Sequence, residues 1–137
     1  PAPFRPLSSE LIRNTDWLIV NEIEFSELHP EKRYPESDDD LLSLPKGRNL
    51  VVTLGSKGAV LVTSDNRIIR LPSPTVKVVD TTGAGDCLIG SFAGALLLGL
   101  EPEDALRVAI TCASESVTKS GAQSSYLSEE SVKKLVG

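Results

Sequence analysis

The sequence contains one histidine and two cysteines, has no methionine, and includes no apolar run long enough to cross a membrane. With one histidine and no Cys-x-x-Cys pair, a zinc site is not expected. Cys87 and Cys112 both lie in apolar helical patterns, and we expect no signal peptide. We therefore expect two reduced core thiols in a cytoplasmic protein, with a disulfide as the alternative.

Clusters of basic residues are also absent. Nineteen Asp and Glu against fourteen Lys and Arg give a net charge of −5. This balance argues against a nucleic-acid or anionic-membrane partner. An anionic ligand would therefore have to be held by backbone donors and a counter-cation.

The length of 137 residues, with 40% hydrophobic and 24% charged residues, is that of one globular domain. The sequence opens on Pro1-Ala2-Pro3 instead of a methionine. We interpret this opening as the middle of a longer polypeptide.

Apolar runs and turn residues predict strands that alternate with helices, which is typical of an α/β layer structure with ligands at the carboxyl ends of the strands. The aspartates 38–40 are expected to cap a short turn at 41–44 after a surface loop from residue 29. The expected strands are 16–20 and 50–54, a hairpin of 59–63 and 67–71, and an extended piece at 76–79; the expected helices are 22–28, about 85–98, about 102–118, and one from Ser128.

The segment Asp80-Thr81-Thr82-Gly83-Ala84-Gly85-Asp86 places two carboxylates around two glycines just before a helix. The first N–H groups of a helix have no helical acceptor, so they form an anion site at the positive end of the helix dipole. Glycines let a phosphoryl group approach the backbone closely, and Asp86 adds a proton acceptor. This pattern favours phosphoryl transfer to a hydroxyl; the alternative is that Asp80 and Asp86 only cap a turn and a helix.

Two better-known phosphate motifs do not fit this segment. A Rossmann fingerprint needs glycine at position 88, which is leucine, and a P-loop needs lysine at position 91, which is serine. The run 80–86 instead resembles the C-terminal signature of the ribokinase-like (PfkB) carbohydrate kinases. Asn21-Glu22-Ile23-Glu24 is similar to the family's Asn-x-x-Glu motif, and residues 52–58 are similar to its nucleotide-site strand and turn.

The resemblance implies a role for each matching residue. Asp86 would be the general base on a sugar hydroxyl, and the amides of Gly83, Ala84 and Gly85 would form the anion hole. Asn21 and Glu24 would lie near the phosphates and the waters of a magnesium ion. The ATP site would be lined by Thr53, Gly55, Ser56 and Gly58, with Gly85.

The positions of Asn21 and Glu24 also suggest a function without the family resemblance. Asn21 ends an expected strand and Glu24 lies three residues on, so both can face one point above the sheet. A carboxylate beside a triphosphate requires a cation between them, for which magnesium with its waters is suited. The alternative for Glu24 is a solvent-facing helix acid.

The segment from Ser116 to Tyr126 resembles the family's loop for a monovalent cation, usually potassium. The implied ligands, several through carbonyl oxygens, are Asp80, Thr82, Ser116, Lys119, Gly121 and Ser125. A helix C-cap at Gly121 is an equally good local interpretation.

The resemblance covers almost the whole chain and implies the nucleotide-binding half of an incomplete three-layer, Rossmann-like sandwich. The N-terminal sugar-binding half and its lid would be absent, which should leave an edge strand and apolar surface exposed. The parent is expected to transfer phosphate from MgATP to the 5-hydroxyl of D-ribose, as a homodimer through the lid. Alternatives are a fructose or nucleoside kinase, or a nucleotide-binding fragment that does not catalyse.

Overall fold

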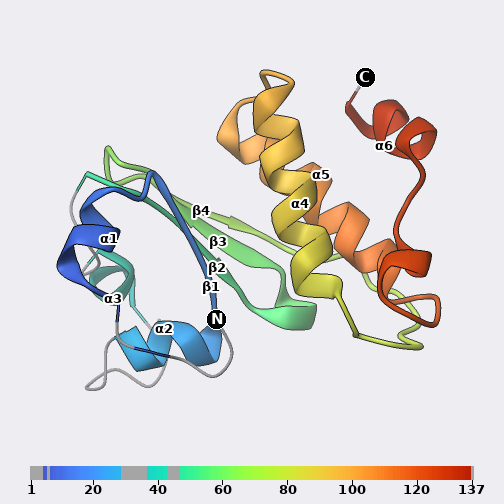
Figure 1. Ribbon diagram of the computed structural model, residues 1–137, viewed down its shortest axis with the longest axis horizontal. Coiled ribbons are helices and arrows are strands. Elements are labelled where there is room, and N and C mark those ends of the chain that lie inside the picture. Colours follow the sequence, from blue (N-terminus) through green and yellow to red (C-terminus); the bar gives the residue numbers. More distant parts are fainter. Residues whose placement is uncertain (1–4, 6, 29–36, 43–46, 137) are drawn as a thin grey trace. The chain divides into compact units, whose positions relative to one another are not determined.

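The computed structural model describes residue 5 and residues 7–28, 37–42 and 47–136, and the chain divides into two compact units (Figure 1). The sheet unit comprises Pro1–Gly55 and Ala59–Arg70. The helical unit comprises Ser56–Gly58 and Leu71–Gly137. Each unit is described by itself.

Four strands form one sheet in the order β1-β2-β3-β4: β1 (Trp17–Asn21), β2 (Asn49–Thr53), β3 (Ala59–Val62) and β4 (Ile68–Leu71). β1 runs parallel to β2, and β2 runs antiparallel to β3. The register pairs Asn21 with Thr53, so both residues lie at the carboxyl edge of the two parallel strands. The predicted strands and the hairpin are confirmed.

One face of the sheet carries the core of its unit. Because successive side chains of a strand point to opposite faces, alternate residues gather on this face: Val20, Leu50, Val52, Val60 and Val62. They pack with Phe25 of α2 (Glu22–Leu28) and Leu41 of α3 (Asp38–Leu42), both fully buried. The residues between them on β2 and β3, including Val51 and Leu61, are fully buried as well, so these two strands are buried on both faces.

The prediction that aspartates 38–40 cap a turn at 41–44 is wrong. All three lie in the first turn of α3, where the helix dipole favours acidic side chains. The cap is Ser37, whose Oγ accepts the N–H of Asp40 at 3.2 Å while Asp40 Oδ2 accepts the N–H of Ser37 at 3.1 Å. Residues 29–36 of the expected loop, and 43–46, lie outside the described residues.

A five-residue helix, α1 (Ser9–Arg13), was not predicted. Its N-cap is Ser8, whose Oγ accepts the N–H of Leu11 at 3.1 Å. One turn of helix is too short to produce an apolar repeat, so a serine was the only signal.

The helical unit contains α4 (Ala84–Leu97), α5 (Pro102–Ser116) and α6 (Glu129–Val136), close to the predicted spans. Buried Cys87, Val108 and Cys112 form its core with partly buried residues that include Val132 and Val136 of α6. Both cysteines are free thiols. Among the described residues, no helix is both long and apolar enough for a membrane crossing.

α5 ends two residues earlier than expected, and its C-cap is Val117. Gly121 therefore lies too far along the chain to cap α5, and that alternative is wrong. The expected extended piece at 76–79 is not a strand; instead the N–H of Val79 donates to the carbonyl of Val117 at 2.7 Å.

Candidate active site

The turn before α4 depends on a glycine at position 83. Gly83 is the N-cap of α4 and has φ of 78°, a left-handed conformation that side chains disfavour. A Cβ at this position would lie 2.8 Å from Tyr126 Oη and 3.0 Å from the Cβ of Ala122. Backbone conformation and packing therefore both require glycine here.

Asp80 joins this turn to the segment after α5. Its Oδ1 accepts the N–H of Thr82 and its Oδ2 accepts the N–H of Gly121, both at 2.9 Å. Hydrogen bonding from Thr82, then from Gly121, lowers the pKa of Asp80 from 3.8 to about 2. Asp80 therefore stays ionised and links the turn to the segment after α5, and it is poorly suited to accept a proton at neutral pH.

Three more hydrogen bonds hold the same two segments together. The N–H groups of Val79 and Asp80 both donate to the carbonyl of Val117, at 2.7 and 3.2 Å, and Tyr126 Oη donates to the carbonyl of Gly83 at 3.0 Å. Sequence analysis did not assign this positioning role to Tyr126. Nothing in local spacing signals it, because Tyr126 and Gly83 are 43 residues apart.

Three backbone N–H groups at the start of α4 are available to a ligand. Within the described part of the chain, the N–H groups of Gly83, Gly85 and Asp86 make no hydrogen bond. The N–H of Ala84, which was expected in the anion hole, donates to the carbonyl of Thr81 at 3.2 Å. A Cβ at Gly85 would meet nothing within 4 Å, so a ligand can approach the backbone there.

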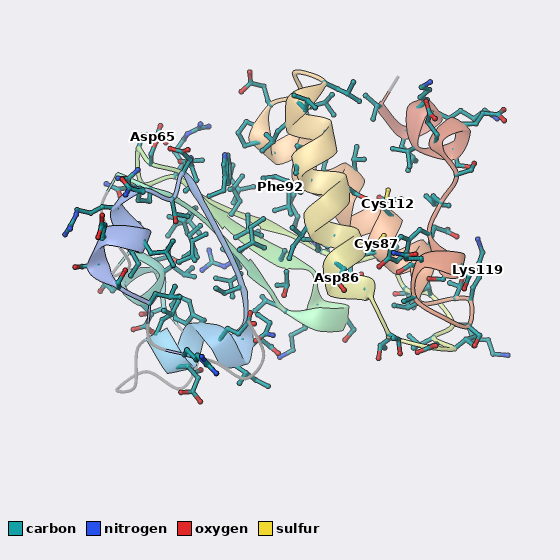
Figure 2. All side chains as sticks on the ribbon, viewed as in Figure 1. Asp65, Asp86, Cys87, Phe92, Cys112 and Lys119 are labelled. Carbon is teal, nitrogen blue, oxygen red and sulfur yellow. The ribbon has the colours of Figure 1, made fainter. Side chains whose placement is uncertain are left out.

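Asp86 lies in the first turn of α4, exposed and beside Cys87, with Cys112 on the neighbouring helix α5 (Figure 2). Burial, and then the negative charge of Asp86, raises the pKa of Tyr126, and both residues line the same hollow beside α4. An exposed carboxylate and available N–H groups therefore share one helical turn. Two of these N–H groups, those of Gly83 and Gly85, are among the three that sequence analysis expected, and the N–H of Asp86 is available where that of Ala84 was expected.

The Asn21–Glu24 motif forms a reciprocal cap at the start of α2. Asn21 Oδ1 accepts the N–H of Glu24 at 2.8 Å, and Glu24 Oε2 accepts the N–H of Asn21 at 2.9 Å. This fixes the Glu24 carboxylate at the carboxyl edge of the sheet, on a half-buried residue. Sequence analysis missed the cap, although Asn followed by Glu three residues later is its usual pattern.

The glycines after β2 have different surroundings. Gly55 begins a 3-10 turn, Gly55–Lys57, with φ of 56°, and Ser56 is exposed. Gly58 has φ of 100°, and a Cβ there would lie 2.0 Å from the carbonyl oxygen of Leu71. Gly58 therefore has a structural requirement that is independent of any nucleotide.

The expected cation ligands fall into two groups. Asp80, Thr82 and Gly121 are brought together by the hydrogen bonds described above, and Lys119 is exposed (Figure 2). Ser116 and Ser125 are buried, and their hydroxyls donate to the carbonyls of Ala113 and Ala122 at 2.8 and 2.6 Å. Across the described ranges, no three His, Cys, Asp or Glu side chains gather as a metal site.

Comparisons with known proteins identify the family. Residues 1–129 match the pfkB family carbohydrate kinases. The chain is 40% identical over 136 residues to ribokinase from Bacillus subtilis, covering 99% of this chain and 44% of that protein. Deoxyribokinase from Salmonella typhi is 38% identical over 135 residues, covering 95% of this chain and 44% of its own length.

The structure of Arabidopsis thaliana ribokinase in complex with ribose and ATP superposes with a TM-score of 0.83 and 34% identity, covering 96% of this chain and 44% of that one. The chain therefore belongs to the pfkB family of carbohydrate kinases and has the ribokinase-like α/β fold. Both predictions are confirmed. The chain spans less than half the length of the relatives that it matches.

Proposed function

We propose that this chain is the phosphate-binding and base-bearing part of an ATP-dependent sugar kinase. The observation that supports this proposal is the first turn of α4, where the available N–H groups of Gly83, Gly85 and Asp86 lie next to the exposed Asp86 carboxylate. Family membership gives this arrangement its chemistry, because pfkB kinases act on carbohydrates. The region would be the C-terminal, nucleotide-binding half of the domain.

In this proposal Asp86 accepts the proton of the attacking sugar hydroxyl. The N–H groups and the positive end of α4 stabilise the charge on the transferred phosphoryl group. Phosphoryl transfer has a loose transition state, so positioning supplies most of the rate and a modest base suffices. The hydrogen bonds of Asp80 and Tyr126 hold the turn in the required shape.

Asn21 and Glu24 are proposed to act on the phosphates of ATP and on the waters of magnesium, as the family resemblance implies. The structure fits this role because a carboxylate suits a hard cation that keeps its waters, and the reciprocal cap fixes that carboxylate. Magnesium would neutralise part of the negative charge of the phosphates. Thr53, Gly55 and Ser56 are proposed to bind the nucleotide.

Potassium is proposed to bind at the segment around Asp80, Thr82 and Gly121, with Ser116, Lys119 and Ser125 as further ligands. The low pKa of Asp80 keeps a negative charge in this segment at neutral pH.

D-ribose, phosphorylated at its 5-hydroxyl, is the proposed acceptor, because the relative from Bacillus subtilis is a ribokinase. Deoxyribose is the second candidate, on the similar identity to the Salmonella deoxyribokinase. We place the protein in the cytoplasm, since its cysteines are free thiols.

A chimera tests the proposal. This chain replaces the matching segment of Bacillus subtilis ribokinase, and ADP formation is measured with ribose, deoxyribose, fructose and adenosine. Asp86→Asn should lower kcat at least about 100-fold, as expected for loss of a general base, with little change in the KM for ATP. Asp104→Asn, at an exposed acid on α5, is the control and should change neither parameter. Equal kcat for the Asp86→Asn variant and its parent would refute the role of Asp86.

The isolated chain gives a second test. Calorimetric titration with ATP and magnesium, with and without potassium, should show binding that potassium strengthens. Ribose-dependent ADP formation by the isolated 137 residues should be negligible. Efficient turnover by the isolated chain would contradict the proposal that the sugar site lies elsewhere.

A further inference from the structure

The two cysteines of the helical unit lie at the same level of a helical hairpin. The short connection between α4 and α5 makes these helices antiparallel neighbours. Cys87 lies ten residues before the end of α4, and Cys112 lies ten residues after the start of α5. Both are free thiols, and both pack with Val108 in one buried cluster (Figure 2). The hairpin therefore brings the two thiols together.

The packing of the hairpin suits a disulfide bond between them. Ala95 shares a face of α4 with Cys87, Ala105 and Ala109 share a face of α5 with Cys112, and all three alanines are at most 3% exposed. Small side chains allow a close approach of two helices, whose axes lie about 8–10 Å apart when packed. Because each Cα lies about 2.3 Å from its axis, facing Cα atoms are roughly 3–5 Å apart at the closest. A disulfide commonly joins Cα atoms about 4.4–6.8 Å apart, so the bond can form within the folded hairpin.

A hollow gives a small oxidant access to this pair. Cys87 and Cys112 both line the hollow of about 440 Å³ that Val132 and Val136 of α6 also line. The two cysteines are only 5% and 1% exposed, and burial raises the pKa of the Cys87 thiol, so little thiolate is present at neutral pH. The thiols should therefore stay reduced in a reducing compartment and react slowly when peroxide accumulates.

We propose that Cys87 and Cys112 are a peroxide-sensitive pair that closes into a reversible disulfide, and that this closure lowers the activity of the proposed kinase. Disulfides in cytoplasmic proteins are usually transient and often sense redox state, which agrees with thiols that are free in the structure. Cys87 follows Asp86 directly and lies in the first turn of α4. Two sulfur atoms in contact must approach to about 2.05 Å to form the bond, and this movement displaces the first turn. The effect on activity rests on the proposed function.

The oxidation takes two steps and needs hydrogen peroxide as the oxidant. The Cys87 thiolate attacks one peroxide oxygen, the O–O bond breaks, and a sulfenic acid forms at Cys87 while the released hydroxide takes up the thiol proton as water. The Cys112 thiol then attacks the sulfenic sulfur, the S–S bond forms, and the hydroxyl group leaves with the second thiol proton as water. Two thiols are thus oxidised to one disulfide, and one peroxide is reduced to two waters.

Peptide mapping of the isolated chain identifies the bond. Trypsin cleaves after Arg107, so Cys87 and Cys112 fall in different peptides. After peroxide treatment and blocking of the remaining thiols, mass spectrometry without reduction should find these two peptides joined. Dithiothreitol should restore both thiols. Cys112→Ala is the control and should instead accumulate a sulfenic acid at Cys87, which dimedone traps.

Equilibrium with glutathione tests whether the fold holds the two thiols at bonding distance. The equilibrium constant for forming the bond with glutathione disulfide should be at least about 10-fold larger in the folded chain than in the urea-unfolded chain. The oxidised chain should accordingly unfold at a higher urea concentration than the reduced chain, because the bond constrains the unfolded state. A lower unfolding midpoint after oxidation would overturn the proposal.

The chimera tests the effect on activity. Peroxide should lower its sugar-dependent kcat at least about 10-fold, because a small displacement of catalytic groups is costly, and dithiothreitol should restore it. The loss should follow the formation of the bond in time. The Cys87→Ala chimera is the control and should keep its kcat through the same treatment, which excludes oxidation elsewhere in the protein as the cause.

The outcomes separate this inference from the proposed function. A reduced chimera without activity would contradict the proposed function, while the joined peptides of the isolated chain would still support the disulfide. An active chimera that forms the bond and keeps its kcat would overturn the effect on activity and leave the proposed kinase standing. Two thiols that both survive peroxide, or a bond between two chains whose yield rises with protein concentration, would overturn the pairing itself.

Discussion

The contact between Gly83 and Tyr126 predicts a measurable coupling. In Gly83→Ala the new Cβ needs the space that Tyr126 Oη occupies, at 2.8 Å, and forces alanine into a left-handed conformation. That conformation costs about 1–2 kcal/mol. Displacement of Tyr126 also removes its hydrogen bond to the Gly83 carbonyl, worth about 1 kcal/mol net. The free energy of unfolding should therefore fall by about 2–3 kcal/mol.

Tyr126→Phe removes the hydroxyl and its hydrogen bond, and should cost about 1 kcal/mol. In the double variant this hydrogen bond is lost only once and the clash with the hydroxyl is gone. The loss should therefore stay near that of Gly83→Ala alone, about 1 kcal/mol less than the sum of the single variants.

Urea denaturation followed by far-UV circular dichroism measures these differences, because the unit that contains the contact carries α4, α5 and α6. Gly85→Ala is the matched control. Its Cβ meets nothing within 4 Å, and its φ is not in the left-handed region, so stability should be unchanged or higher. Additive losses in the double variant, or a Gly83→Ala variant as stable as Gly85→Ala, would refute this account of the turn.

Three further predictions follow from single contacts. Asn21→Ala removes the Oδ1 that accepts the N–H of Glu24 and keeps the bond from the Asn21 N–H to Glu24 Oε2; it should cost about 1 kcal/mol, measured by urea denaturation with Trp17 fluorescence. The pKa of Asp80 is lowered to about 2, so the stability that its ionised form adds is complete above the usual pKa of 3.8 and is lost as pH falls through 2. Asp80→Asn should therefore flatten the fall of the free energy of unfolding between pH 4 and pH 2. An unchanged dependence on pH would contradict the structural role of the Asp80 hydrogen bonds. Phe25→Ala empties a fully buried site and should cost about 3–5 kcal/mol in the same urea assay.

The strands were predictable because the sequence pattern that indicates a strand lies within the strand itself. A short continuous apolar run that ends at turn residues, such as 50–54 before Gly55, predicts a buried strand, and Leu50 and Val52 of this run lie in the core of the sheet unit. The start of α4 was predictable for a similar reason, since glycines next to an apolar helical run are a strong local signal. Short elements such as α1 escaped prediction because one turn of helix shows no repeat.

The shape of the candidate site was predictable only in part. The residues of the turn, Asp80 to Asp86, were found from sequence, but the groups that hold the turn lie more than 30 residues away, at Val117, Gly121 and Tyr126. Such contacts leave no trace in spacing. Spacing also did not predict that the Ala84 N–H donates to the carbonyl of Thr81 while those of Gly83 and Gly85 make no hydrogen bond to the described residues.

The two carboxylates of the turn differ in the number of hydrogen bonds that they accept. Asp80 accepts two backbone N–H groups, and this holds its pKa at about 2, so it stays ionised and fixes the backbone. Asp86 accepts no hydrogen bond from the residues that the structure describes, and it is exposed on the first turn of α4. A general base must offer an oxygen lone pair to the substrate proton, and both oxygens of Asp80 already accept N–H groups. We therefore propose opposite roles for two aspartates six positions apart. The N–H groups of Thr82 and of the distant Gly121 hold Asp80 in a structural role, and Asp86, which accepts no such bond from the described residues, remains for the proposed proton transfer.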